Sequence, residues 1–170
     1  MGILREKATC EQLARGLYLF VCEAAAHDQK LSVNQALQGE DNAGLGFEMH
    51  LARMFAVMWV CQKELDNYRL CERVLNCFRH EFYESLKDSS LQKKELSESE
   101  NLLQQRCAQY YRAMRNTEGA GPFFHLGKAI ASNLHKEETW DAHAILEISV
   151  MMGGFMEAVS KVLSQYRVTS

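Results

Sequence analysis

The chain has 170 residues, of which 47% are hydrophobic and 24% are charged, and its formal net charge is -3. This length suits one domain with its own core, and the hydrophobic fraction excludes disorder as the default state. The 19 Lys and Arg residues are outnumbered by 22 Asp and Glu residues. The basic surface typical of nucleic-acid binding is therefore absent. We expect a single helical domain over residues 1–170 that has no nucleic-acid partner.

The beginning of the chain has some features of a secretory signal peptide, but charged residues interrupt its apolar part. Arg5 and Lys7 precede an apolar stretch over residues 17–22. Arg15 interrupts the approach to this stretch, and Glu23 follows it where a signal peptide would still be uncharged. No segment of the chain approaches the ~18 apolar residues needed to span a bilayer. We therefore expect a cytoplasmic protein that makes no membrane contact.

The spacing of the six cysteines includes no CxxC motif, and each cysteine lies singly within a helical pattern. Structural zinc sites use paired ligands at short spacing, and a chain of this length can build a core without disulfides. We therefore expect reduced thiols that act as small buried hydrophobic side chains.

Helical periodicity dominates the first quarter of the chain, which holds no proline to interrupt it. The spacing predicts an amphipathic helix whose apolar stripe is formed by Leu13, Leu17, Phe20, Ala24, His27 and Leu31. Asp28 or Ser32 is a candidate cap for a short continuation through Leu37. The glycine-rich segment 39–46 then has the composition of a loop.

The same period extends from Phe47 to Lys87. One uninterrupted helix of this length would be a rod of ~60 Å, whereas a compact domain of this size has a radius of gyration of only ~15 Å. We therefore expect a break near Asp66 and Asn67, whose side chains compete for local backbone hydrogen bonds and can cap a new helix. The alternative is one long helix that projects from the domain and pairs with another subunit.

Three helices are predicted in the second half of the chain. A polar helix follows the turn at residues 88–90, and Ser97 with Glu100 matches a capping box at which it could restart. It would end at the segment 117–121, and Pro122 would begin the next helix, which runs to about Leu134. A last helix would follow Thr139 as its cap. The predicted stripes of the first and third of these helices are Leu103, Cys107, Tyr110 and Met114, and Ala144, Ile148, Met151, Phe155, Val159, Val162 and Tyr166.

These patterns predict an all-α fold, an irregular multi-helix bundle of five to seven helices around a single core. Alternating hydrophobic and polar residues, which would indicate β-strands, do not compete with these assignments. There is no internal repeat of fixed period.

Two histidine–glutamate pairs are the candidate metal ligands. Glu23 and His27 lie four residues apart in the first predicted helix, and His143 and Glu147 lie four apart in the last. This spacing places both side chains on one helix face, where they could supply two ligands or a histidine with its orienting carboxylate. If the first and last helices are neighbours, all four residues could converge on one ion. The alternative is two ordinary surface pairs, and the sequence identifies no cofactor.

A candidate anion site lies at the helix that begins with Pro122. Free N–H groups and the positive end of the helix dipole attract anions at a helix start. His125 and Lys128 could add charge there beside Phe123, and the glycines at 119 and 121 would let a ligand approach the backbone. The alternative is that the glycines allow a tight reversal while the neighbouring aromatic residues anchor the helix.

Gly153 and Gly154 stand inside the last predicted helix, where each glycine costs about 1 kcal/mol relative to alanine. A compensating close approach of another helix, from the same or a second subunit, makes them candidate interface residues. We therefore expect a non-catalytic cytoplasmic helical protein that acts through protein–protein interaction and self-associates as a homodimer. The alternative is a helical sensor or enzyme that binds a metal or small molecule between the first and last helices.

Overall fold

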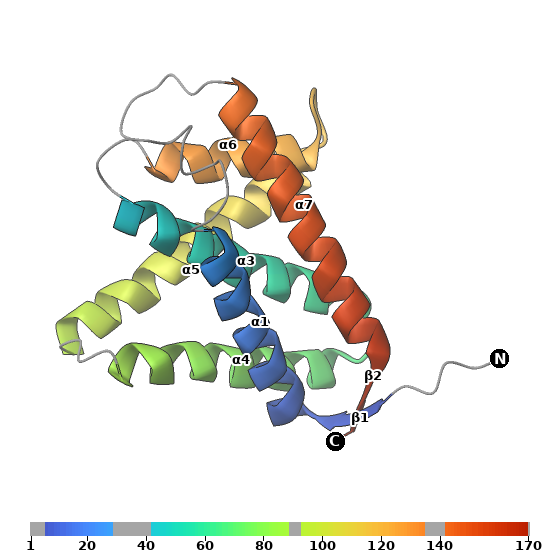
Figure 1. Cartoon of the computed structure of the whole chain (residues 1–170). Helices are drawn as coiled ribbons and strands as arrows, with labels where there is room; N and C mark the ends of the chain where they lie inside the picture. Colours follow the sequence, from blue (N-terminus) through green and yellow to red (C-terminus); the bar gives the residue numbers. More distant parts are fainter. Residues whose placement is uncertain (1–5, 29–41, 89–92, 135–141, 170) are drawn as a thin grey trace.

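The computed structural model describes residues 6–28, 42–88, 93–134 and 142–169 of the chain. These residues form six helices in one compact arrangement, with a short strand at each end (Figure 1). The elements are β1 (Glu6–Thr9), α1 (Cys10–Asp28), α3 (Asn42–Glu64), α4 (Tyr68–Asp88), α5 (Lys93–Arg115), α6 (Pro122–Leu134), α7 (Ala142–Gln165) and β2 (Tyr166–Thr169). The predicted all-α multi-helix bundle is confirmed.

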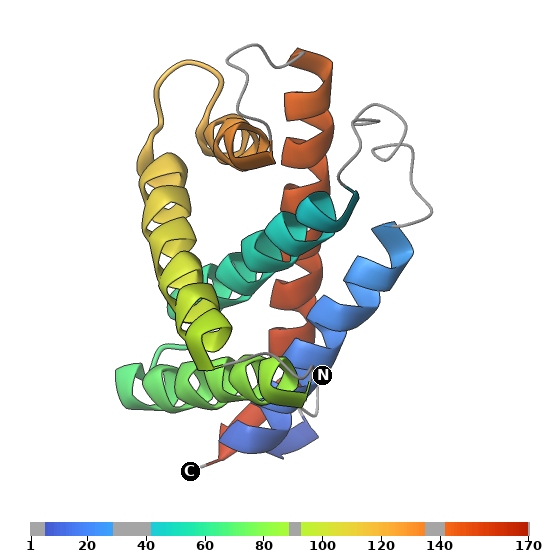
Figure 2. The same ribbon diagram turned by 90° about the vertical axis from the view of Figure 1, so that its left-hand side faces the viewer.

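Helix α3 is the centre of the bundle. It packs against each of the other five described helices, and Figure 2 shows it crossing the middle of the molecule. Every residue from Leu51 to Val57 is buried, which is the pattern expected of a helix that is covered on all sides. This run includes Arg53, which is 2% exposed and whose guanidinium carbon lies 5.7 Å from the ring centre of Phe155 on α7. Burial lowers the pKa of Arg53 to about 10, so the side chain remains charged at neutral pH.

The break predicted near Asp66 and Asn67 is present, and the alternative of one long helix is wrong. Helix α3 ends at Glu64, and α4 begins at Tyr68. The side chain of Asn67 accepts a hydrogen bond of 3.1 Å from the backbone N–H of Leu70, and its carbonyl accepts one of 2.9 Å from Cys71. Asn67 is therefore the N-cap of α4, and the cap lets the chain turn back onto the bundle.

Two predicted boundaries in the first two-thirds of the chain are wrong. The segment 39–46 was expected to be a loop, but α3 begins at Asn42, because the packing of a central helix outweighs the low helix propensity of its glycines. The restart at Ser97 does not occur, since α5 runs through this residue from Lys93. The continuation around Ser32 to Leu37 and the cap at Thr139 lie outside the described residues.

The reversal between α5 and α6 follows the prediction. Gly119 and Gly121 have φ angles of 60° and 87°, which favour glycine. Pro122 is then the first residue of α6, and the helix ends at Leu134 as predicted.

The two strands were not predicted from the sequence. Strands β1 and β2 pair in parallel, from Glu6 beside Tyr166 to Thr9 beside Thr169. Thr9 also caps α1, because its hydroxyl accepts from the N–H of Gln12 and its own N–H donates to the Gln12 side chain. The ladder thereby joins the beginning of α1 to the end of α7. Figure 1 shows that α1 leads away from this end of the molecule and α7 runs back towards it, and Phe20 of α1 stacks on Phe155 of α7 at 5.3 Å.

Candidate functional site

The side of α7 that faces away from the bundle is apolar over its central turns. Leu146 is 53% exposed, Val150 is 68% exposed, and the exposed Gly154 lies one turn further along the same face. Phe123 of α6 is 41% exposed and lies beside Gly153, where an added β-carbon would be 3.8 Å from its ring. We call these five residues the α7 outer face.

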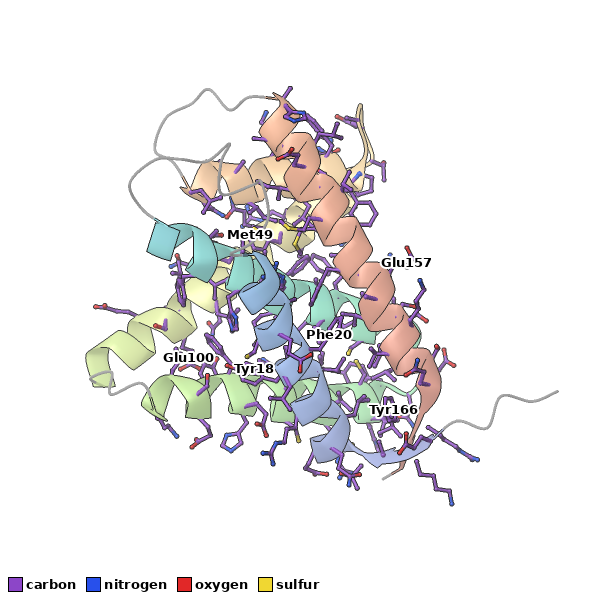
Figure 3. The ribbon with its side chains drawn as sticks, in the orientation of Figure 1. Tyr18, Phe20, Met49, Glu100, Glu157 and Tyr166 are labelled. Carbon is purple, nitrogen blue, oxygen red and sulfur yellow. The ribbon has the colours of Figure 1, made fainter. Side chains whose placement is uncertain are left out.

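Charged side chains border the α7 outer face at both ends. Before Leu146, Nε2 of His143 lies 3.1 Å from a carboxylate oxygen of Glu147. After Gly154, Nζ of Lys161 lies 2.7 Å from a carboxylate oxygen of Glu157, which Figure 3 shows on the outer side of the helix. An apolar centre bounded by charged residues is typical of a surface that binds another protein.

The opposite side of α7 packs closely on α6 through Gly127. A β-carbon at Gly127 would lie 2.2 Å from Oγ of Ser149 and 2.6 Å from the carbonyl oxygen of Ile145. The close helix approach that the sequence suggested for Gly153 and Gly154 thus occurs at Gly127 within this chain. Gly154 has no neighbour within 4 Å of its added β-carbon, so its notch remains open to a second molecule.

Helix α7 is also long enough and apolar enough, by length and composition alone, to cross a membrane. Its inner face supplies buried core residues, among them Ile148, Met152 and Val159. One such helix is weak evidence for a membrane span, because a core helix of a soluble protein can have the same length and composition.

A buried polar network joins α3, α5 and α6 around the carboxylate of Glu48, which is 5% exposed. Nε of Arg106 donates to Oε2 at 2.9 Å, and the hydroxyl of Tyr110 donates to Oε1. Nδ2 of Asn133 lies 3.0 Å from Oε1 and equally far from the side-chain oxygen of Gln109. Three helices are therefore held together by hydrogen bonds to one carboxylate.

Two opposing effects act on the pKa of the Glu48 carboxyl. Burial raises the pKa of Glu48, while the hydrogen bond and positive charge of Arg106 oppose the rise. Tyr110 is fully buried, and its ring meets Phe55 edge to face at 5.6 Å. A substrate would have to displace this packing to reach the carboxylate, so we assign the network to holding the helices in register.

A second internal cluster joins α1, α3 and α4 around His50. Its ring stacks on Phe82 with centres 5.8 Å apart and meets the edge of Tyr18 at 6.1 Å. Burial lowers the pKa of His50. The hydroxyl of Tyr18 lies 2.5 Å from Oγ of Ser85, and burial raises the pKa of Tyr18 to about 12. Both rings are therefore neutral at physiological pH.

A groove of about 410 Å³ runs between α1 and the strand end of the fold. Apolar residues of α1, including Leu17 and Phe20, form one wall together with Val162 of α7, and Lys7 and Glu23 add charge. Figure 3 places Phe20 and Tyr166 on this side of the molecule. The groove lies between the first and last helices, which is where the alternative prediction expects a small-molecule site.

A smaller groove of about 300 Å³ separates α4 from α5. Arg79, Tyr83, Glu100 and Cys107 are among its lining residues. Burial raises the pKa of Cys107 to about 12, so its thiol remains protonated and is a poor nucleophile. All six cysteines are free thiols, but only Cys10, Cys61 and Cys71 are buried as predicted, whereas Cys22, Cys77 and Cys107 are partly exposed.

The four predicted metal ligands are only partly brought together. His143 and Glu147 form the predicted contact on the first turns of α7. Glu23 lines the groove together with Val162, which belongs to the other half of α7. The side chain of His27 lies outside the described residues. Among the side chains that are described, no group of three or more His, Cys, Asp or Glu residues is arranged to hold a metal ion.

The predicted anion-site residues lie on the first two turns of α6. Nε2 of His125 donates a hydrogen bond of 2.8 Å to the carbonyl oxygen of Glu118, which ties the ring to the preceding turn. Lys128 is exposed, and Phe124 packs against the core. Phe123 lies beside α7 instead, where it belongs to the α7 outer face.

Sequence reasoning missed the Glu48 network and the role of Gly127. The one available signal was Tyr110, which falls on the predicted apolar stripe of its helix, because a buried tyrosine hydroxyl requires a hydrogen-bond partner. Its partner Glu48 lies 62 positions away in the sequence.

Comparison of the chain with protein-family models, with curated protein sequences and with solved structures finds no match. The class of the protein, an all-α multi-helix bundle, is thus defined by its own fold.

Proposed function

We propose that this chain is a non-catalytic protein-interaction module of the cytoplasm that self-associates through the α7 outer face. The observation that carries the proposal is the pair of exposed aliphatic side chains, Leu146 and Val150, on a helix whose other side is already packed. Exposed apolar residues that lie singly need no explanation, whereas a contiguous group bounded by charges marks a contact surface. Phe123 widens this group beyond a single helix.

The test is the association state of the protein as a function of concentration, measured by sedimentation velocity. The wild-type chain is expected to sediment as a dimer at micromolar concentration, and V150E is expected to sediment as a monomer. The matched control is Y68E, since Tyr68 on α4 is a large hydrophobic residue that is 78% exposed. A wild-type protein that stays monomeric at 100 µM, roughly the range of weak dimers, would contradict self-association. So would equal effects of V150E and Y68E.

A second candidate function is the binding of a small molecule in the groove between α1 and the ends of α7 and β2. The groove favours it, because its volume of about 410 Å³ falls in the range of ligand sites and its wall is apolar with a few charges. Gly16 lines the groove, and a β-carbon there would meet nothing within 4 Å. The glycine thus leaves room that a larger side chain would fill.

The fluorescent anion 8-anilinonaphthalene-1-sulfonate tests this candidate, because it binds apolar surfaces near positive charge. If the groove binds such molecules, G16W should abolish the fluorescence increase while V150E leaves it in place. If V150E abolishes it and G16W does not, the dye reports the α7 outer face and the groove has no role.

A further inference from the structure

The outer side of α7 has a symmetric order of residues about Val150. His143, Leu146, Val150, Gly154 and Glu157 follow one another at intervals of three, four, four and three. These intervals keep all five on one face of a helix. Leu146 and Gly154 are thus equally far from Val150 on its two sides, and so are His143 and Glu157.

An antiparallel partner helix would use this order to fill a gap. With Val150 of both copies at the two-fold axis, Leu146 of each copy stands opposite the partner's Gly154. Leu146 is 53% exposed, and Gly154 has open space where a side chain would be. A leucine seated over a glycine lets two helices approach closely with continuous packing. The contact between Leu146 and the partner's Gly154 therefore occurs twice, once on each side of the two-fold axis.

Charge favours the same arrangement. Three positions beyond Leu146 and Gly154, the antiparallel pairing places His143 opposite the partner's Glu157, so an imidazole meets a carboxylate at each end. A parallel pairing would place Glu157 beside the partner's Glu157, which brings like charges together. The α7 outer face is thus complementary to itself in one direction only.

We propose that the partner of the α7 outer face is a second copy of this chain, with the two α7 helices antiparallel and Val150 on the two-fold axis. This inference rests on the proposed function, because it specifies the geometry of the same contact. It also gives Gly154 its role, which is to receive the partner's Leu146.

Cysteine cross-linking tests the register. V150C should form a disulfide-linked dimer on oxidation with copper phenanthroline, because the two copies of this residue meet at the axis. L146C alone should not, since its two copies would lie ~12 Å apart along the helices, beyond the reach of a disulfide. A mixture of L146C chains with G154C chains carrying a larger tag should give the mixed dimer. The wild-type chain, oxidised in parallel, measures the background from its six native thiols.

The outcomes separate this inference from the proposed function. Cross-linking of L146C alone, as efficient as that of V150C, would show a parallel pair and overturn the register while leaving self-association intact. A wild-type dimer in which none of the introduced cysteines cross-links would place the interface elsewhere and overturn the inference. A monomeric wild-type protein would remove the proposed function itself.

The variant G154L provides an independent measurement. The added side chain occupies the notch that receives the partner's Leu146, so the dimer dissociation constant should rise at least tenfold. The thermal stability of the monomer should not fall, because nothing lies within 4 Å of the added β-carbon. An unchanged dissociation constant would overturn the assigned role of Gly154.

Discussion

Nε of Arg106 on α5 donates a hydrogen bond of 2.9 Å to Oε2 of Glu48 on α3. The two residues lie 58 positions apart in the sequence, and this contact gives a positively charged partner to a carboxylate that is almost fully buried. Removing one partner of such a pair leaves the other charge buried, which costs more than the pair contributes. The stability of the bundle therefore depends on keeping the network around Glu48 complete.

The first prediction concerns the hydroxyl of Tyr110, which donates to Glu48. Y110F should lower the free energy of unfolding by about 2 kcal/mol, because a buried charged acceptor loses a donor. The matched control is Y111F on the next residue, whose side chain is 42% exposed, and its effect should stay within about 0.5 kcal/mol. Urea denaturation at pH 7 measures both. Equal effects of the two variants would show that the Tyr110 bond does not stabilise the fold.

The second prediction concerns pH and His50. Burial places the folded-state pKa of His50 below its ordinary value of 6.5, so the unfolded chain takes up the proton first as the pH falls. The contribution of neutral His50 to stability is fully present above pH 6.5 and is lost between 6.5 and the lower folded-state pKa. The wild type should therefore lose stability relative to H50Q as the pH is lowered through this window.

Urea denaturation at a series of pH values between 7.5 and 5 checks the prediction for His50. The control H80Q alters an exposed histidine on α4 and separates the effect of burial from the loss of an imidazole. A constant difference between wild type and H50Q over the whole series would contradict the prediction.

The third prediction concerns the crossing of α6 and α7. G127A should destabilise the protein by about 3 kcal/mol, because its β-carbon would lie 2.6 Å from the backbone oxygen of Ile145. G16A in α1 is the matched control, since its β-carbon meets nothing within 4 Å. It should raise stability by up to ~1 kcal/mol through helix propensity. Thermal melting measures the stability of both variants. A G127A variant as stable as G16A would show that α6 and α7 can move apart without loss of stability.

The variant G127A/S149A refines this test. Removing the Ser149 hydroxyl relieves the contact at 2.2 Å but leaves the one to the Ile145 carbonyl. The double variant should therefore recover only part of the lost stability. Complete recovery would show that the side chain, and not the backbone, limits the approach.

Local signals in the sequence predicted much of the fold. Asn67 was recognised as a break because its side chain caps a helix using only neighbouring atoms, which a sequence shows directly. Pro122 and the glycines before it act locally in the same way. The periodic stripes predicted the buried sides of α5 and α7, since apolar residues repeat with the helical turn.

The features that the sequence did not predict depend on distant residues. In the sequence, Glu48 is indistinguishable from a glutamate on a helix surface. Its burial depends on Arg106 and Tyr110, which belong to another helix. Gly127 and Gly154 are both helix glycines, and only the packing shows that the first is covered and the second is open. For the same reason the Gly153–Gly154 pair indicated an interface without indicating which side of α7 it occupies.

The pairing of β1 with β2 has a consequence for the synthesis of the protein. The register joins Glu6 to Tyr166 and Thr9 to Thr169, so the ladder cannot form until the ribosome has released the segment after α7. Contacts between such distant segments carry a high loop-closure cost and form late in folding. Until then residues 6–9 lack the neighbouring strand with which they pair in the folded protein.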